Sequence, residues 1–256
     1  MNTLNHYPPA CILDYFTTAV TDACDALDGV TDGVISALSL CHFDPYSLVD
    51  QTVTCNGTSL PISTQDAEIV AKSWQGAQRS DGSFLWYGVN PGASLDVDTG
   101  TTCTGPVTNC TGAPFAIGPD WIKNWVLDDA DFDITNLTWA QYSDIFDRSV
   151  SEYEDLLGSN NPDLSAFRAA GGKIVHWHGG ADYLIPTDGS IDYYQTRVGR
   201  GPPRQGLLPI LPRARGGPLW RWEWGGSHGS LRSRGRLGGK GPGACYPARL
   251  EWQPDS

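Results

Sequence analysis

Apolar residues recur with helical spacing near the start of the chain. In the stretch "ACILDYFTTAVTDAC", Ile12, Leu13, Phe16 and Val20 are separated by one, three and four positions. Residues at this spacing share one face of an α-helix. The pattern therefore predicts an amphipathic helix over residues 10–24.

Two further segments carry helix signals at their ends. "STQDAEIVAKSWQGAQ" begins with Ser63 or Thr64 as a capping residue, which predicts a second helix. "NPDLSAFRAAGG" is short and ends in two glycines, and it is expected to form a short helix that stops at them. Between these, residues 118–157 mix amphipathic helix with polar turns.

A strand is predicted where the pattern changes from helical spacing to a continuous apolar run. Lys173 to Trp177, in "KIVHWHG", is interpreted as a buried strand, and a loop follows it. Pro186 then opens "PTDGSIDYYQTRV", which is typical of a helix start. Helix, glycine, strand, loop and helix in this order indicate an α/β unit.

The charge of the chain is divided unevenly along its length. Residues 1–200 hold 8 basic and 26 acidic side chains, whereas residues 201–256 hold 9 basic and 3 acidic ones. The last 56 residues also contain 12 of the 30 glycines and 8 of the 18 prolines. The two parts therefore do not follow the same compositional constraints. No apolar run reaches the roughly 20 residues that a membrane helix requires.

Six cysteines lie in the acidic part, and their number and spacing favour disulfides over a zinc site. Cys103 and Cys110 are expected to close a turn-rich loop, whereas Cys11 and Cys55 can pair with each other or with partners outside the chain. Three sequons predict glycosylation in a secreted protein. They begin at Asn56, Asn109 and Asn136.

The segment "CDALDGVTDGVISALSLC" gathers acidic side chains between two cysteines. Asp25, Asp28 and Asp32, with backbone carbonyls between them, could surround a hard cation such as calcium. Gly29 and Gly33 would let the loop turn tightly. The alternative is a pair of solvent-exposed Asp-Gly turns, and the spacing alone does not distinguish the two.

This segment resembles the calcium loop of the tannase and feruloyl esterase family, secreted serine esterases with an α/β-hydrolase core and a large inserted lid. "YPPAC" and "GGKIVHWHGGADYLIPTDGSIDYY" resemble the same family, so that the resemblance covers nearly all of residues 1–200. It implies a disulfide between Cys24 and Cys41 that closes the loop. The implied calcium ligands are the side chains of Asp25, Asp28 and Asp32 and the carbonyls of Val30 and Val34.

The resemblance implies an α/β fold with a partial α/β-hydrolase core and an inserted lid. Residues 1–20 would end the first half of the core, residues 21–168 would form the lid with its calcium loop, and residues 169–200 would supply a core strand, the acid loop and a helix. Residues 201–256 are interpreted as an out-of-frame, disordered tail.

Asp182, in "HGGADYLIP", is the catalytic acid that the resemblance implies. In α/β-hydrolases the acid lies on a loop after a late strand and holds the catalytic histidine. The alternative is an aspartate that caps the following helix. His176 and His178 precede the acid and are interpreted as packing residues.

Neither the nucleophile nor the catalytic histidine of the family is found in residues 1–200. The family's serine lies in a Gly-Cys-Ser-x-Gly-Gly turn upstream of "YPPAC", so that Met1 is expected to be an internal methionine. A one-base shift of reading frame from Gly206 onward can turn the tail into the family's strand, His-Cys pair and loop, with the histidine codon straddling Pro218 and Leu219. His228 and Cys245 would then be accidents of frame.

The expected function of the intact relative is hydrolysis of aromatic carboxylic esters, such as galloyl or feruloyl esters, by a Ser-Asp-His mechanism. The lid aromatics Trp86, Tyr87, Trp121 and Trp125 are candidates to line an aryl pocket, or else belong to the core. This chain alone is expected to be inactive, with a small-molecule aromatic ester as the substrate of the intact enzyme and neither nucleic acid nor membrane as a partner. The alternative is a non-catalytic, calcium-stabilised, disulfide-linked binding module.

Overall fold

The structure is a computed structural model that describes residues 1–199, apart from positions 98, 105, 106, 108 and 114, and the segments 211–213, 230–233 and 250–253. Contacts divide the chain into two units, Met1–Gly216 and Gly217–Ser256. Within the second unit, β9 (Ser230–Ser233) pairs antiparallel with β10 (Leu250–Gln253). The remainder of that unit, including His228 and Cys245, lies outside the described residues, and the frameshift stays a prediction.

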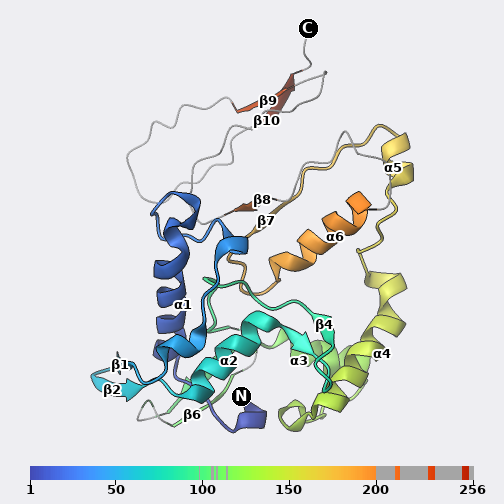
Figure 1. The fold of residues 1–256 in the computed structure, drawn as a ribbon. Coiled ribbons are helices and arrows are strands. Elements are labelled where there is room, and N and C mark those ends of the chain that lie inside the picture. Colours follow the sequence, from blue (N-terminus) through green and yellow to red (C-terminus); the bar gives the residue numbers. More distant parts are fainter. Residues whose placement is uncertain are drawn as a thin grey trace. The chain divides into compact units, whose positions relative to one another are not determined.

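The first unit is mainly helical (Figure 1). Its α-helices are α1 (Ala10–Cys24), α2 (Thr64–Gln75), α3 (Ile117–Trp121), α4 (Trp139–Leu157), α5 (Ser165–Ala169) and α6 (Thr187–Gly199). A π-helical turn, Ile122–Val126, continues α3. Short 3-10 helices cover Asn2–Leu4, Asp25–Asp28, Leu38–Leu40, Pro45–Leu48 and Ile134–Asn136.

The strands of the first unit are short and pair two by two. They are β1 (Thr52–Cys55), β2 (Thr58–Pro61), β3 (Ala77–Gln78), β4 (Phe84–Trp86), β5 (Thr101–Cys103), β6 (Cys110–Gly112), β7 (Trp177–Gly179) and β8 (Leu211–Arg213). The pairs β1–β2, β3–β4 and β5–β6 are antiparallel hairpins. The pair β7–β8 is parallel, with Trp177 opposite Leu211.

The predicted first helix is confirmed as α1, and its apolar face forms the core. Ile12, Leu13, Phe16 and Val20 are each at most 1% exposed. The first three pack with residues of β1 and α2, and α2 lies beside α1 (Figure 1). Burial of each such side chain is worth about 1.5–3 kcal/mol, so that this face anchors the unit.

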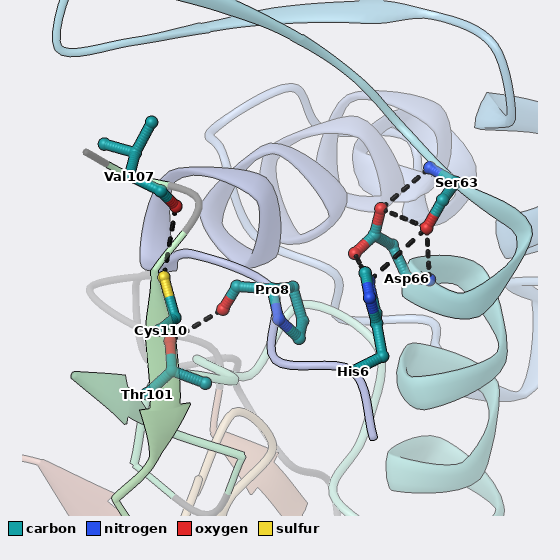
Figure 2. A network of polar contacts seen from close by, with 7 residues as sticks. All are labelled: His6, Pro8, Ser63, Asp66, Thr101, Val107 and Cys110. Atoms are coloured by element: carbon teal, nitrogen blue, oxygen red, sulfur yellow. Dashed lines mark hydrogen bonds and ion pairs between the residues drawn. The ribbon is translucent and has the colours of Figure 1, made fainter. Parts of the chain in front are cut away.

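The predicted second helix is confirmed as α2, and its start is fixed by a capping box. The Ser63 hydroxyl accepts the Asp66 N–H at 3.1 Å, and an Asp66 carboxylate oxygen accepts the Ser63 N–H at 2.7 Å. His6 Nε2 lies 2.6 Å from the other Asp66 oxygen, so that the buried carboxylate also ties the N-terminal segment to α2 (Figure 2). The helix ends at Gln75. Gly76 follows it with a φ of 84°, and the backbones of Trp86 and Gly88 come so close to it that a side chain would not fit.

The predicted helices near the end of the described unit are confirmed as α5 and α6. Gly171 follows α5 with a φ of 80°, as expected for a glycine stop, and Pro186 directly precedes α6. The prediction of a buried strand over Lys173–Trp177 is wrong. The strand β7 is Trp177–Gly179, and Val175 and Trp177 are 56% and 72% exposed.

The reason for this exposure lies in the sheet around β7. A parallel strand is buried when further strands flank it and helices cover both faces. Within the described residues, β7 pairs with β8 alone. Its apolar side chains therefore remain at the surface. The division of residues 1–200 into core and lid stays a prediction.

Candidate functional site

Asp182 lies on the loop between β7 and α6, where its carboxylate is held by several donors. Its Oδ1 accepts the N–H groups of Leu184 and Ile185, each at 3.0 Å. Its Oδ2 lies 3.3 Å from His178 Nε2. Because the two N–H donors precede the first residue of α6, Asp182 structures its own loop instead of capping the helix.

His178 makes contacts that the sequence analysis missed. It was interpreted as a packing residue, yet its ring joins Asp182 on one side and Ser190 of α6 on the other, with Nδ1 2.8 Å from the Ser190 hydroxyl. Its side chain is 13% exposed. The signal available in the sequence was the spacing of four between His178 and Asp182 across a Gly-Gly turn. His176 is exposed, and its ring centroid lies 6.5 Å from that of His178.

The loop that carries Asp182, between β7 and α6, is held by two hydrogen bonds and by packing against the core. The fully buried Thr187 donates its hydroxyl to the Gly179 carbonyl at 2.6 Å. The buried Asn90 donates its side-chain amide to the Gly180 carbonyl at 3.0 Å. Ala181 and Tyr183 pack against the core. These contacts fix the loop that carries Asp182.

The electrostatic surroundings of Asp182 favour its ionised form. Partial burial raises the pKa of this carboxyl, but the N–H groups of Ile185 and Leu184, together with His178, outweigh it and hold the pKa below its usual value. Asp182 is therefore an ionised acceptor at neutral pH. Such a group can orient an imidazole and stabilise the imidazolium.

The acidic loop after α1 is organised around Asp25. This carboxylate is 6% exposed and accepts the N–H groups of Asp32, Gly33 and Val34 at 3.0–3.2 Å. Asp28 accepts the Val30 N–H at 2.9 Å. The carboxylates of Asp25 and Asp28 are thus bound by backbone N–H groups of the same loop.

The two glycines of this loop adopt the conformation that the sequence analysis expected. Gly29 and Gly33 have φ values of 89° and 78°, in the left-handed region. A Cβ at either position would meet nothing within 4 Å, so that backbone conformation and not space requires glycine there.

The predicted calcium ligands are not gathered in this conformation. Within the described part of the chain, no three His, Cys, Asp or Glu side chains come together in a way that could hold a metal ion. Asp28, Val30 and Asp32 are exposed, Val34 is half-buried and Asp25 is buried. Carboxylates and carbonyls are the oxygen donors that calcium prefers, so that the chemistry of the donor set suits the ion.

The hydrogen bonds to Asp25 make stability depend on pH. The Gly33 N–H, followed by those of Asp32 and Val34, lowers the pKa of Asp25 against the opposing effect of burial. A carboxyl with a lowered folded-state pKa stabilises the fold above its unfolded pKa of about 3.9, and this contribution is lost as the pH falls through the folded value. We expect the free energy of unfolding in EDTA to fall from about pH 5 downward, and to fall less in Asp25→Asn. Urea unfolding at several pH values measures the free energy of unfolding of both proteins. The prediction would be contradicted if that free energy changed with pH equally in the wild type and in Asp25→Asn.

Three disulfides are present among the described residues. Cys24 is joined to Cys41, and Cys103 to Cys110, as the sequence analysis expected. Cys11 is joined to Cys55, which resolves the pairing that the sequence left open. The Cys24–Cys41 bond closes the acidic loop at its ends and packs with Val20, Ile35 and Trp74.

Comparison with known proteins now identifies the family. Residues 1–200 match the family model described as tannase and feruloyl esterase. The chain belongs to the tannase and feruloyl esterase family. Its named relatives in this family are feruloyl esterases and a tannase.

Individual relatives and solved structures agree with this family. The chain is 37% identical over 198 residues to a "Probable feruloyl esterase" of Arthroderma benhamiae, covering 76% of this chain and 36% of that protein. It is 28% identical to a tannase of Aspergillus oryzae, covering 75% and 39%. The tannin acyl hydrolase structure from Aspergillus niger superposes with a TM-score of 0.70 at 28% identity, covering 76% of this chain and 37% of that one. The chain thus spans little more than a third of the length of these relatives.

The aromatic candidates of this tannase and feruloyl esterase family member fall into two groups. Trp86 and Tyr87 contact each other, with ring centroids 5.5 Å apart, and Trp86 lies against Gly189 of α6. Burial raises the pKa of Tyr87, and Asp192 of α6 adds to this effect. Both aromatics therefore adjoin the helix that follows Asp182.

Trp121 and Trp125 form the other group, around the π-helical turn. Their rings stack at 5.7 Å, and Tyr153 of α4 meets the Trp121 ring edge-on at 4.8 Å. Tyr153 also donates its hydroxyl to the Trp125 carbonyl at 2.8 Å. These contacts join α4 to the π-helical turn.

The three predicted glycosylation sites lie at the surface of the protein. Asn56, Asn109 and Asn136 are all exposed, so that each is accessible to modification. None of the helices in the described part of the chain is long and apolar enough to cross a membrane. Glycosylation and secretion stay predictions.

Proposed function

We propose that this chain is the acid-bearing part of a serine carboxylesterase that cleaves aromatic esters, such as galloyl or feruloyl esters, and that Asp182 is the catalytic acid. The observation that carries the proposal is the geometry of Asp182, a carboxylate fixed by two N–H donors on a loop between a parallel strand and a helix. This is the place that the acid of an α/β-hydrolase occupies. The names of the relatives supply the substrate class.

In the proposed mechanism, Asp182 holds the catalytic histidine in the tautomer that accepts the serine proton. It then stabilises the imidazolium that forms while the serine attacks the ester carbonyl. The acyl-enzyme is hydrolysed by water, with the histidine acting first as base and then as acid. The serine and that histidine are not found in residues 1–200, so that this chain alone is proposed to be inactive.

The substrate's aryl group is proposed to rest on Trp86 and Tyr87. These two side chains adjoin α6, the helix that begins five residues after Asp182, whereas Trp121 and Trp125 are engaged with α4. An exposed Trp face suits stacking on an aromatic acid. Trp86 is 45% exposed and so offers such a face.

The experiment that tests this proposal uses a chimera. Residues 1–200 replace the matching segment of the Arthroderma benhamiae relative, which supplies a complete chain around them. Hydrolysis of methyl ferulate and methyl gallate is measured by release of the free acid. Activity in the chimera supports the proposal, and a folded chimera that hydrolyses neither ester contradicts it.

Calcium is proposed as a structural ion of the acidic loop. Asp25, Asp28 and Asp32 would hold it with the carbonyls of Val30 and Val34, and the ion would neutralise three carboxylates that otherwise repel one another. The support is the all-oxygen donor set in a loop whose ends are joined by the Cys24–Cys41 bond. No step of the reaction depends on this ion.

Calcium removal is expected to lower the stability of the chain. At a calcium concentration about 100-fold above Kd, binding adds about 2.7 kcal/mol, which corresponds to roughly 5–10 °C in Tm for a unit of this size. Thermal unfolding in calcium and in EDTA measures the difference. Asp28→Asn should reduce it, and Asp155→Asn, an exposed change on α4, should not. Equal Tm values in calcium and EDTA would exclude the site.

A non-catalytic binding module remains the second candidate. The three disulfides and the separate aromatic group around Trp125 favour it, because together they describe a cross-linked unit with an exposed aromatic face. Binding of a polyphenol or carbohydrate by this chain, with no activity in the chimera, would support it. Activity in the chimera would favour the esterase instead.

A further inference from the structure

His178 connects three elements that meet at the acid loop. The residue itself is in β7, Asp182 is in the loop that follows, and Ser190 is in the first turn of α6. Its Nδ1 lies 2.8 Å from the Ser190 hydroxyl and its Nε2 lies 3.3 Å from Asp182 Oδ2. With its side chain 13% exposed, the imidazole is mostly shielded from competing water.

The direction of these two contacts follows from the chemistry of the groups. A carboxylate accepts hydrogen bonds only, so that the nitrogen facing Asp182 must carry a proton. In a neutral imidazole the other nitrogen is then an acceptor, which the Ser190 hydroxyl can satisfy by donating to it. The Asp182 carboxylate therefore favours the tautomer with a proton on Nε2, and the Ser190 hydroxyl is compatible with it by donating to Nδ1.

The acceptor positions of Asp182 limit what else it can bind. A carboxylate offers about four such positions. The N–H groups of Leu184 and Ile185 take two of them on Oδ1. His178 Nε2, 3.3 Å from Oδ2, lies where a donor to a third position would be. One position on Oδ2 is left for another donor.

We infer that His178, oriented by Ser190, is a positioning residue that fixes the rotation of the Asp182 carboxylate and leaves one Oδ2 position for the catalytic imidazole. The two N–H groups hold only Oδ1, and a carboxylate held at one oxygen can still rotate its other oxygen away. The contact from His178 prevents that rotation. This inference rests on the proposed function, in which Asp182 is the acid.

A merely structural role for His178 makes a different prediction about Asp182. If the imidazole only filled space, its removal would leave the ionisation of Asp182 unchanged in a folded protein. If it donates to Oδ2, its removal takes away one of the interactions that favour the charged carboxylate, and the pKa of Asp182 rises.

The test is a titration of Asp182 by carbon-13 NMR in the complete chain, labelled at the aspartate carboxyl. His178→Ala is expected to raise the pKa of Asp182. His178→Gln, whose amide can still donate, should raise it less, and Ser190→Ala should also raise it because Nδ1 loses its partner. His176→Ala is the matched control on the same segment and should leave the titration as in the wild type. An unchanged Asp182 titration in a folded His178→Ala protein would overturn the inference.

The chimera separates this inference from the proposed function. In an active chimera, His178→Ala should lower kcat with little change in KM, and His178→Gln should restore part of the loss. A chimera without activity would overturn the proposed function while the titration still tests the contact with Asp182. Covalent labelling of Ser190 by a fluorophosphonate would also overturn the inference, because Ser190 and His178 would then be a nucleophile and its base.

Discussion

Asp182→Asn is expected to lower kcat of the chimera by about 10⁴-fold, the loss that follows when an acid of this kind is made neutral. The amide nitrogen can donate to a neighbouring imidazole and so stabilise the wrong tautomer, and the negative charge that would balance the imidazolium is gone. Hydrolysis of methyl ferulate under single-turnover conditions measures the effect on the chemical step.

The control for this change is another aspartate of the same chain. Asp155 is exposed on α4, and Asp155→Asn should leave kcat within about twofold, since exposed substitutions away from a site rarely disturb it. If Asp182→Asn retained a tenth or more of the chimera's activity, Asp182 would not be the acid.

The purified chain of 256 residues is expected to hydrolyse methyl ferulate and methyl gallate at least about 10⁴-fold more slowly than the active chimera. Removal of triad members costs about this much or more, and residues 1–200 supply Asp182 without the family's serine turn. The assay should include calcium, so that low activity does not reflect an unstable loop.

Two observations would contradict this expectation. One is turnover by the purified chain that survives further purification and disappears in Asp182→Asn. The other is covalent labelling of the chain by a fluorophosphonate, which would reveal an activated serine. Circular dichroism with calcium present shows whether the protein under test is folded.

Local features of the sequence were predicted correctly because their causes lie within a few residues. The spacing of Ile12, Leu13, Phe16 and Val20 predicts α1, since neighbours on a helix face are three or four positions apart. Ser63 or Thr64 as a capping residue predicts the start of α2, and the structure adds Asp66 as the reciprocal partner of Ser63. Gly29 and Gly33 occupy the left-handed conformation that tight turns require.

The strand prediction failed because burial is not a local property. The apolar run over Lys173–Trp177 has the composition of a buried strand, but burial depends on flanking strands and covering helices. Among the described residues β7 has a single neighbour, β8, and so Trp177 stays exposed. The strand itself is Trp177–Gly179, so that the apolar run placed neither its burial nor its bounds correctly.

Family motifs in the sequence pointed to individual residues of the candidate site but not to the contacts between their side chains. Asp182 was found from "HGGADYLIP", and the role assigned to it stays a prediction. The contact between His178 and Asp182 was missed, because spacing places the two residues near each other but does not say which way either side chain points. The sequence also did not distinguish Trp86 from Trp125 as candidates for the aryl pocket. In the fold, Trp86 lies beside α6 and Trp125 contacts Tyr153 of α4.

By itself, the sequence predicted α1, α2, α5 and α6, the cap at the start of α2, the family and the loop closed by Cys103 and Cys110. Tertiary structure alone decided that Cys11 joins Cys55, that His178 lies between Asp182 and Ser190, and that Trp86 adjoins α6. The physical reason is the range of the interactions. Helix and turn signals act over a few positions of one segment. The Cys11–Cys55 bond and the contact of Trp86 with α6 depend on how segments that are distant in the chain pack against each other. The contacts of His178 depend on the direction of its side chain in the folded loop.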